Sequence, residues 1–131
     1  MSQENVERVR QGFEAFNRRD TNGLLEKLDV DIEWVPFRST LEGTVYRGHK
    51  GVLQNLAETF EDWEWVRMDP QDLRDLGDRI VVLGRIAAQA KDGPATEVAA
   101  AWLIKLRDDK AIRFETFLDQ QQALDAAGLE K

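Results

Sequence analysis

Three turn signals divide the second half of the chain into long extended segments. They lie at Gly77-Asp78, 91–94 and 107–110, and each contains Gly or Asp, residues that favour tight hairpin turns. Strands joined by tight turns pair with their neighbours in antiparallel fashion. This half of the chain therefore predicts a meander of long strands at 80–90, 96–106 and 111–118.

An extended run also begins before the first turn. Trp63, Trp65 and Val66 have the aromatic and β-branched character of a strand. The stretch 69–76 leaves two alternatives open, because Pro70 fits both a bulged continuation of the strand and a short helical turn.

The first half of the chain has helical spacing instead. Val6, Val9, Phe13 and Phe16 recur at intervals of three or four residues, which places them on one face of a helix. A short second helix follows, with Asp20 as its N-cap. The remaining predicted segments are a strand at Val30–Phe37, a polar loop at 38–46, a helix after Gly48-His49, and a last helix from the cap Asp119 to near Gly128.

This order places helices at one end of the chain and antiparallel strands at the other. Such segregation indicates the α+β class, with a curved antiparallel or mixed sheet wrapped around the N-terminal helices. The chain has 131 residues, the usual size of one domain, and contains no linker or repeat. We therefore expect a single domain over residues 1–131.

Composition excludes several kinds of site. The chain has 18 Lys and Arg against 25 Asp and Glu, a net charge of −7, which argues against binding to nucleic acid or to an anionic membrane surface. It has no Cys and one His, which excludes disulfides, thiolate nucleophiles and His-rich metal centres, so we expect no metal and no cofactor. The N-terminus is polar and acidic, and no apolar run is long enough to span a bilayer, so we expect a cytoplasmic protein.

Four segments, in their order and spacing, resemble the SnoaL-like proteins of the nuclear transport factor 2-like superfamily. They lie at 13–25, 30–34, 46–52 and 118–129, and the resemblance extends over nearly the whole chain, roughly from Val6 to Leu129. The resemblance implies a cystatin-like α+β cone around one mostly apolar pocket for a small organic molecule, and homodimers formed through the sheet. Ketosteroid isomerase, polyketide cyclases, dehydratases and members without known activity share this fold, so the fold alone does not choose a reaction.

The ketosteroid isomerase mechanism does not carry over to this chain. Alignment with that enzyme places its three proton-handling roles at Gly12, Val35 and Trp102, none of which can transfer a proton. If Val35 and Trp102 face the pocket, strand alternation turns Glu33 inward as well. The same alignment directs further residues into the pocket, namely Leu83, Arg85 and Ala87 of the middle strand and Arg113, Glu115, Phe117 and Asp119 of the last strand.

Arg85 lies alone in an apolar strand, and an inward arginine requires a carboxylate partner. Glu33, Glu115 and Asp119 are the candidates. Such a pair would orient a polar group of a ligand or polarise a water molecule. Epoxide hydrolases of the superfamily use a carboxylate-Arg-carboxylate arrangement of this kind. The position of their second carboxylate is occupied here by Ala87, so the match is incomplete. The alternative is a structural ion pair on the outer face of the sheet or at a dimer interface.

Three other residues have two interpretations each. In the SnoaL-like cyclases that this chain resembles, an acid/base carboxylate stands at the position of Asp119, so the resemblance implies that role for Asp119. The alternative is that Asp119 only caps the last helix. Tyr46 would donate a hydrogen bond at the pocket mouth, and His49 would shuttle a proton. The alternatives are that Tyr46 packs on the neighbouring loop and that His49 is exposed in the first turn of its helix.

Two functional hypotheses follow. The first is a cofactor-free acid/base isomerase, cyclase, dehydratase or hydrolase in which Asp119, Arg85 and Tyr46 are catalytic. The second is a non-catalytic module for small-molecule binding or dimerisation. In either case we expect the ligand to be lined by Glu33, Val35, Trp102, Glu115, Phe117 and His49.

Overall fold

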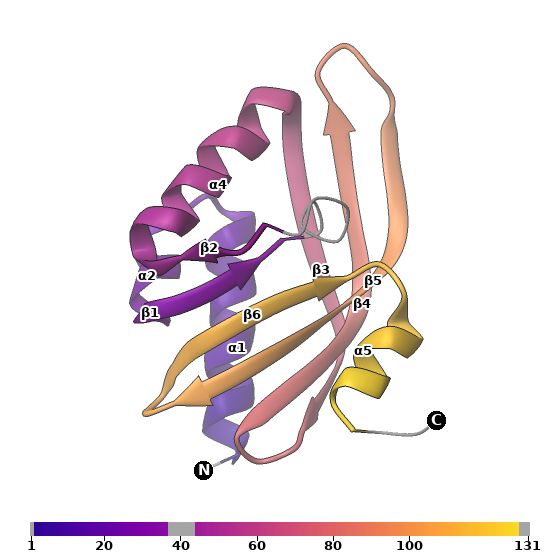
Figure 1. Ribbon diagram of the computed structural model, residues 1–131. Helices are drawn as coiled ribbons and strands as arrows, with labels where there is room; N and C mark the ends of the chain where they lie inside the picture. Colours follow the sequence, from indigo (N-terminus) through magenta and orange to yellow (C-terminus); the bar gives the residue numbers. More distant parts are fainter. Residues whose placement is uncertain (1, 37–43, 129–131) are drawn as a thin grey trace.

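A long, strongly bent sheet of six strands forms the frame of the molecule, with α1 and α4 on its inner face and α5 on its outer face (Figure 1). This computed structural model describes residues 2–36 and 44–128. The helices are α1 (Ser2–Asn17), α2 (Thr21–Glu26), α4 (Gly48–Asp62) and α5 (Gln120–Ala126). The strands are β1 (Leu28–Val35), β2 (Tyr46–Arg47), β3 (Trp63–Asp75), β4 (Arg79–Ala90), β5 (Ala95–Arg107) and β6 (Lys110–Phe117).

The strands lie in the order β2-β1-β6-β5-β4-β3. Strands β3 to β6 form the predicted antiparallel meander, and β1 joins it by pairing in parallel with β6. The sheet is therefore mixed, and the α+β cone with N-terminal helices is confirmed.

Two local predictions are resolved in the first half of the sheet. Of the stretch 69–76, residues 69–75 continue β3 as a strand with a register shift between Pro70 and Asp72, so the bulged alternative is correct. The short strand β2 was not expected, because a polar loop was predicted up to Tyr46. Phe37, the predicted end of the first strand, lies outside the described residues.

Two aspartates cap helices as their sequence positions predict. The Asp20 carboxylate accepts a hydrogen bond from the backbone nitrogen of Gly23 at 3.0 Å, at the start of α2. The Asp119 carboxylate accepts from the backbone nitrogens of Gln121 and Gln122, at 2.9 and 3.3 Å. Each cap satisfies backbone donors that a first helical turn leaves without intrahelical partners.

The inner face of the sheet is packed against α1 by aromatic residues. The Phe13 ring of α1 meets the Trp102 ring edge-on, at 4.9 Å between centroids, and Trp34 stacks on Phe114 at 4.5 Å. Such ring pairs contribute about 0.5–1.5 kcal/mol each beyond the area they bury. The Phe13–Trp102 contact joins α1 to the sheet, and the Trp34–Phe114 stack joins β1 to β6 within the sheet.

The outer face has a second, smaller core under α5. Val81, Ala101 and Leu103 of the sheet are buried against Ala123 and Ala127 of the helix. Strand β4 is consequently apolar on both faces in its first half, where Ile80 and Val82 belong to the inner core.

The predicted orientation of side chains is correct for β5 and wrong for three other strands. Trp102 is fully buried in the inner core, as expected. On β1, β4 and β6 the inward residues are instead Trp34, Val82 with Ile86, and Phe114. Because successive side chains of a strand alternate between faces, a shift of one residue turns the expected set to the outer face. The residues corrected in this way are Glu33, Val35, Leu83, Arg85, Ala87, Arg113, Glu115 and Phe117.

Candidate functional site

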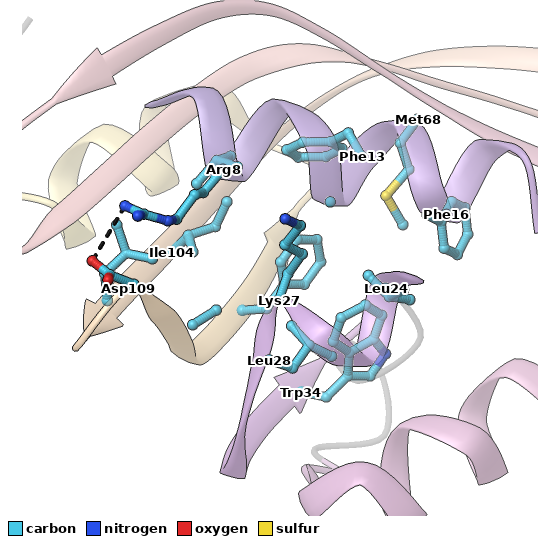
Figure 2. A pocket seen from close by; sticks show the side chains of 15 residues that line it. Arg8, Phe13, Phe16, Leu24, Lys27, Leu28, Trp34, Met68, Ile104 and Asp109 are labelled. Atoms are coloured by element: carbon cyan, nitrogen blue, oxygen red, sulfur yellow. Dashed lines mark ion pairs between the residues drawn. The ribbon is translucent and has the colours of Figure 1, made fainter. Parts of the chain in front are cut away.

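A mostly apolar cavity of about 40 Å³ lies between α1, the end of α2 and the inner face of the sheet (Figure 2). Its walls come from helix residues on one side and from strands β1, β3, β5 and β6 on the other. Gly12, in the middle of α1, has no side chain to fill this space, and a Cβ placed there would meet no atom within 4 Å. The apolar lining residues are Val9, Phe13, Phe16, Leu24, Leu28, Trp34, Met68, Ile104, Leu106, Ala111 and Phe114.

The ionisable residues that line this cavity are Arg8, Lys27 and Asp109, and we call these three the mouth (Figure 2). Arg8 Nη1 lies 3.2 Å from the Asp109 carboxylate. Lys27 Nζ donates a hydrogen bond to Gln11 Oε1 at 2.8 Å. The cavity thus combines an apolar interior with a charged mouth.

A second, smaller space of about 20 Å³ lies deeper along the inner face. Phe16, Trp34, Met68 and Phe114 line both spaces, so these four side chains form the partition between them. The two spaces are therefore neighbouring parts of one interior.

The deeper space contains two buried polar side chains. Asn55 is 4% exposed, and its Oδ1 accepts a hydrogen bond from Trp34 Nε1 at 2.9 Å. Thr116 is 2% exposed, and its hydroxyl has no hydrogen-bond partner among the described residues. Buried polar groups without partners are rare in folded proteins. This hydroxyl therefore offers a hydrogen bond to whatever occupies the space.

Arg85, predicted to be catalytic, lies on the outer face of the sheet. Its Nε is 3.2 Å from Glu97 Oε2 on the neighbouring strand, and the two side chains are 39% and 55% exposed. The structure therefore supports the alternative of an exposed structural ion pair for Arg85. Asp119, predicted as its acid/base partner, is an exposed helix cap and lines neither space of the interior.

Tyr46 and His49 also lie outside the interior. Tyr46 is buried, and its hydroxyl donates to Glu58 Oε1 of α4 at 2.6 Å. His49 Nε2 donates to the backbone carbonyl of Leu28 at 2.9 Å. Both residues tie β1 and β2 to α4, and neither lines either space.

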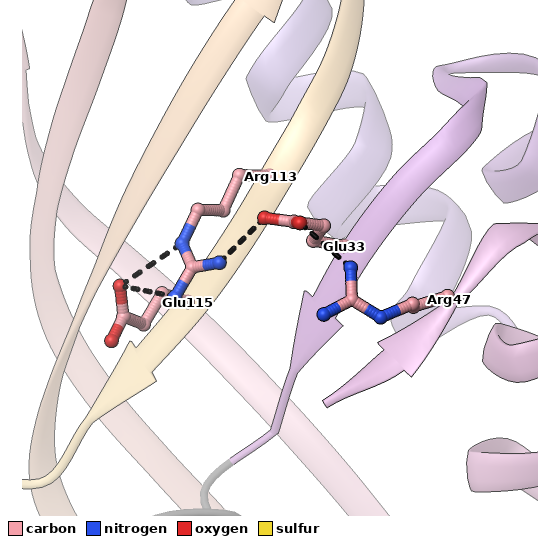
Figure 3. A network of polar contacts seen from close by, with 4 residues as sticks. All are labelled: Glu33, Arg47, Arg113 and Glu115. Atoms are coloured by element: carbon pink, nitrogen blue, oxygen red, sulfur yellow. Dashed lines mark hydrogen bonds and ion pairs between the residues drawn. The ribbon is translucent and has the colours of Figure 1, made fainter. Parts of the chain in front are cut away.

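Two of the three expected carboxylates, Glu33 and Glu115, lie instead in an outer-face network (Figure 3). Glu33 accepts hydrogen bonds from Arg113 Nη1 at 2.6 Å and from Arg47 Nη1 at 2.8 Å, and Arg113 Nη2 lies 3.4 Å from Glu115 Oε1. The hydrogen bonds from Arg113 and Arg47 lower the pKa of Glu33 below its ordinary value of 4.5. The network joins β2, β1 and β6 on the face opposite the cavity.

Replacing Glu33 with Gln is expected to lower the free energy of unfolding by about 1 kcal/mol at pH 7, because the network is only partly buried. A carboxylate whose pKa is lower in the folded state stabilises the fold above its unfolded pKa and loses this effect as pH falls through the folded value. The difference between wild type and variant should thus shrink below pH 4.5. Urea titrations from pH 3 to 7 measure it, with Asp31→Asn as an exposed control on the same strand. A difference that does not change with pH would contradict this assignment.

The polar residues that line the interior could not be identified from the sequence. Arg8, Lys27, Asn55 and Thr116 belong to no motif or spacing that would mark them. Gly12 was the available signal, because a glycine inside a helix costs stability and needs a reason.

The described part of the chain contains no group of three or more His, Asp or Glu residues that could hold a metal ion. Within residues 2–36 and 44–128, no helix has the length and apolar character needed to cross a membrane.

A family model of the SnoaL-like domain matches residues 9–114 of the chain. Solved structures with the same fold include a protein of unknown function similar to nuclear transport factor 2 from Burkholderia pseudomallei K96243, with 27% identity, a TM-score of 0.81 and coverage of 93% of this chain and 95% of that chain. The protein TerC, co-crystallised with polyporic acid, has 27% identity and a TM-score of 0.81, with coverage of 93% and 96%. A further such protein from Burkholderia xenovorans LB400 has 29% identity and a TM-score of 0.75, with 97% of both chains covered. No curated protein matches the chain significantly.

Proposed function

The chain belongs to the SnoaL-like domain family, and on this basis we propose that the interior between α1 and the sheet binds a small, mostly apolar organic molecule. The observation that carries the proposal is the cavity itself, with its eleven apolar lining residues and the open position at Gly12. Concave apolar sites with a few placed polar groups are the usual form of small-molecule sites, although sites for drug-sized ligands measure roughly 300–1,000 Å³. At about 40 Å³ this cavity is smaller, so an eight-carbon probe requires the side chains shared with the deeper space to move.

The chemistry of the deeper space favours binding over acid/base turnover. Its described lining residues include Asn55, Thr59 and Thr116 as polar groups and no Asp, Glu, His, Lys, Arg or Tyr. Such groups can orient a carbonyl or hydroxyl of a ligand, but they do not exchange protons near neutral pH. The function proposed here is therefore the binding hypothesis, and the homodimer expected from the sequence stays a prediction.

The comparison with TerC supports an organic ligand. That protein shares 27% identity with this chain over nearly its whole length and was co-crystallised with polyporic acid. The same fold, at this level of identity, is thus compatible with a small organic molecule as ligand.

Substitutions of Gly12 test the proposal. Ala and Leu have similar helix propensities, so both should raise the free energy of unfolding by up to about 1 kcal/mol. Ala adds one methyl group to the cavity wall, whereas Leu extends three carbons further into the cavity. With 1-octanol as a neutral probe in isothermal titration calorimetry, we expect Gly12→Ala to bind within about threefold of wild type. Gly12→Leu should bind at least about tenfold more weakly, since ~1.4 kcal/mol of lost contact is a factor of ten.

The Ala variant is the matched control, because it stabilises the same helix and fills much less of the space than Leu does. Wild-type affinity in the Leu variant would show that octanol binds elsewhere and would remove the support for this site.

A further inference from the structure

We propose that the natural ligand of the interior is an amphipathic organic anion whose acidic head group, a carboxylate or its equivalent, binds at the mouth to Lys27 and Arg8 while its apolar part enters the cavity. This inference deepens the proposed function and rests on it. It concerns what the mouth selects, which the apolar walls alone do not determine.

Lys27 is the first group that carries the inference. It follows α2 directly and lines the cavity, and its ammonium nitrogen is held by the neutral Gln11 amide oxygen at 2.8 Å. Among the described residues, Lys27 has no carboxylate within 4.0 Å. A positively charged group at the edge of an apolar cavity, with no carboxylate beside it, is available to pair with an anion from solution.

Arg8 is the second group. Its two described contacts, to Asp109 at 3.2 Å and to Asn5 Oδ1 at 3.4 Å, both use Nη1. The remaining guanidinium nitrogens are not used in these contacts. The Asp109 side chain is 66% exposed, so a pair with it is weak, and a ligand carboxylate can replace it at small cost.

The charge balance at the mouth points the same way. Two cations and one carboxylate line the cavity, a local charge of +1, in a chain whose net charge is −7. An anion would therefore meet a favourable field at this opening, although the protein as a whole repels it.

The walls define the rest of the ligand. Beyond the mouth the lining is apolar, from Val9 and Phe13 on the helix to Ile104 and Phe114 on the sheet. Burial in such walls contributes roughly 25 cal/mol for each Å² of apolar surface and requires no polar group on the buried part of the ligand. A molecule with one charged end and an apolar body fits both features.

Octanoate and 1-octanol form the test pair, since they share an eight-carbon chain and differ in the head group. At pH 7 and low salt, calorimetry should show that wild type binds octanoate at least about tenfold more tightly than octanol. Lys27→Gln should remove most of this preference and leave octanol affinity within about twofold. Lys105→Gln, the same change on an exposed residue of β5, is the matched control and should leave both affinities unchanged.

A variant with the opposite sign strengthens the test. Asp109→Asn removes the carboxylate from the mouth, and Asn tolerates the left-handed backbone of this position, where φ is 72°. We expect octanoate to bind several-fold more tightly to this variant, with octanol unchanged.

The outcomes separate the two proposals. If octanol binds and octanoate binds no better, or if Lys27→Gln leaves the preference intact, the anion assignment is wrong while the apolar site stands. If neither probe binds, the proposed function fails and this inference fails with it.

Discussion

Replacing Gly84 with Ala is expected to lower the free energy of unfolding by about 3 kcal/mol or more, the upper range for overpacking a tight site. Gly84 lies in the middle of β4 and pairs with Pro70 of β3 and Ala100 of β5. An added Cβ would overlap the carbonyl oxygen of Asp69 and lie 3.2 Å from the backbone nitrogen of Gln71. Both neighbours are backbone atoms of the β3 bulge, so no side-chain rotation can relieve the overlap.

Glycine is needed at this position because there is no room for a side chain. The register shift of β3 between Pro70 and Asp72 brings the β3 backbone close to the β4 backbone. Gly12→Ala is the matched control, since the same methyl group meets no atom within 4 Å there and should stabilise α1. Equilibrium urea unfolding of both variants is the measurement. A loss below about 1 kcal/mol for Gly84→Ala would contradict the close approach of β3 and β4.

Replacing Trp102 with Ala is expected to cost about 3–5 kcal/mol, the range for removing a large aromatic residue from a packed core. Trp102 is 0% exposed and holds α1 to the sheet through its edge-on contact with Phe13. The loss has two parts, the apolar area that is no longer buried and the void left between the helix and β5. A typical domain has only about 5–15 kcal/mol to lose, so this variant should lose a large fraction of its stability.

Trp102→Phe serves as the control for this change. Phenylalanine keeps a ring against Phe13 and removes the indole N–H, which has no partner among the described residues. Its cost should therefore be well below that of the Ala variant. Equal losses for the two variants, in urea titrations monitored by circular dichroism, would show that the ring contact does not stabilise the fold.

Much of the fold is predictable from this sequence because its signals are local. Turns at Gly77-Asp78, 91–94 and 107–110 and the caps Asp20 and Asp119 act within a few residues of the chain, and each marks the boundary of an element. The family resemblance then gives their arrangement, and the matched model over residues 9–114 agrees with it.

Which face of the sheet each side chain points to could not be predicted from the sequence. In β4, Ile80 and Val82 face the inner core while Val81 faces α5, so the apolar pattern does not distinguish the faces. Arg85 was directed into the interior by the alignment with ketosteroid isomerase, but its partner Glu97 comes from the adjacent strand on the outer face. A partner supplied by strand pairing has no fixed spacing in sequence.

The interior site was predictable in kind but not in its residues. An apolar pocket was implied by the family resemblance, whereas Lys27 and Arg8 line the same cavity only because α1 and α2 pack against each other. From the sequence, Gly12 could be recognised only as a position unable to transfer a proton. That it leaves one side of the cavity open depends on the residues around it, which the fold brings together.

The central claim is that a small organic molecule binds between α1 and the sheet. The most direct measurement is an isotope-filtered NOE spectrum of labelled protein with unlabelled 1-octanol, which records the protein methyl groups close to the probe. We predict NOEs to the methyl groups of Leu24, Met68 and Ile104, which line the cavity. NOEs confined to the exposed residues Leu53, Val98 and Leu118 would place the probe on the surface and contradict the account.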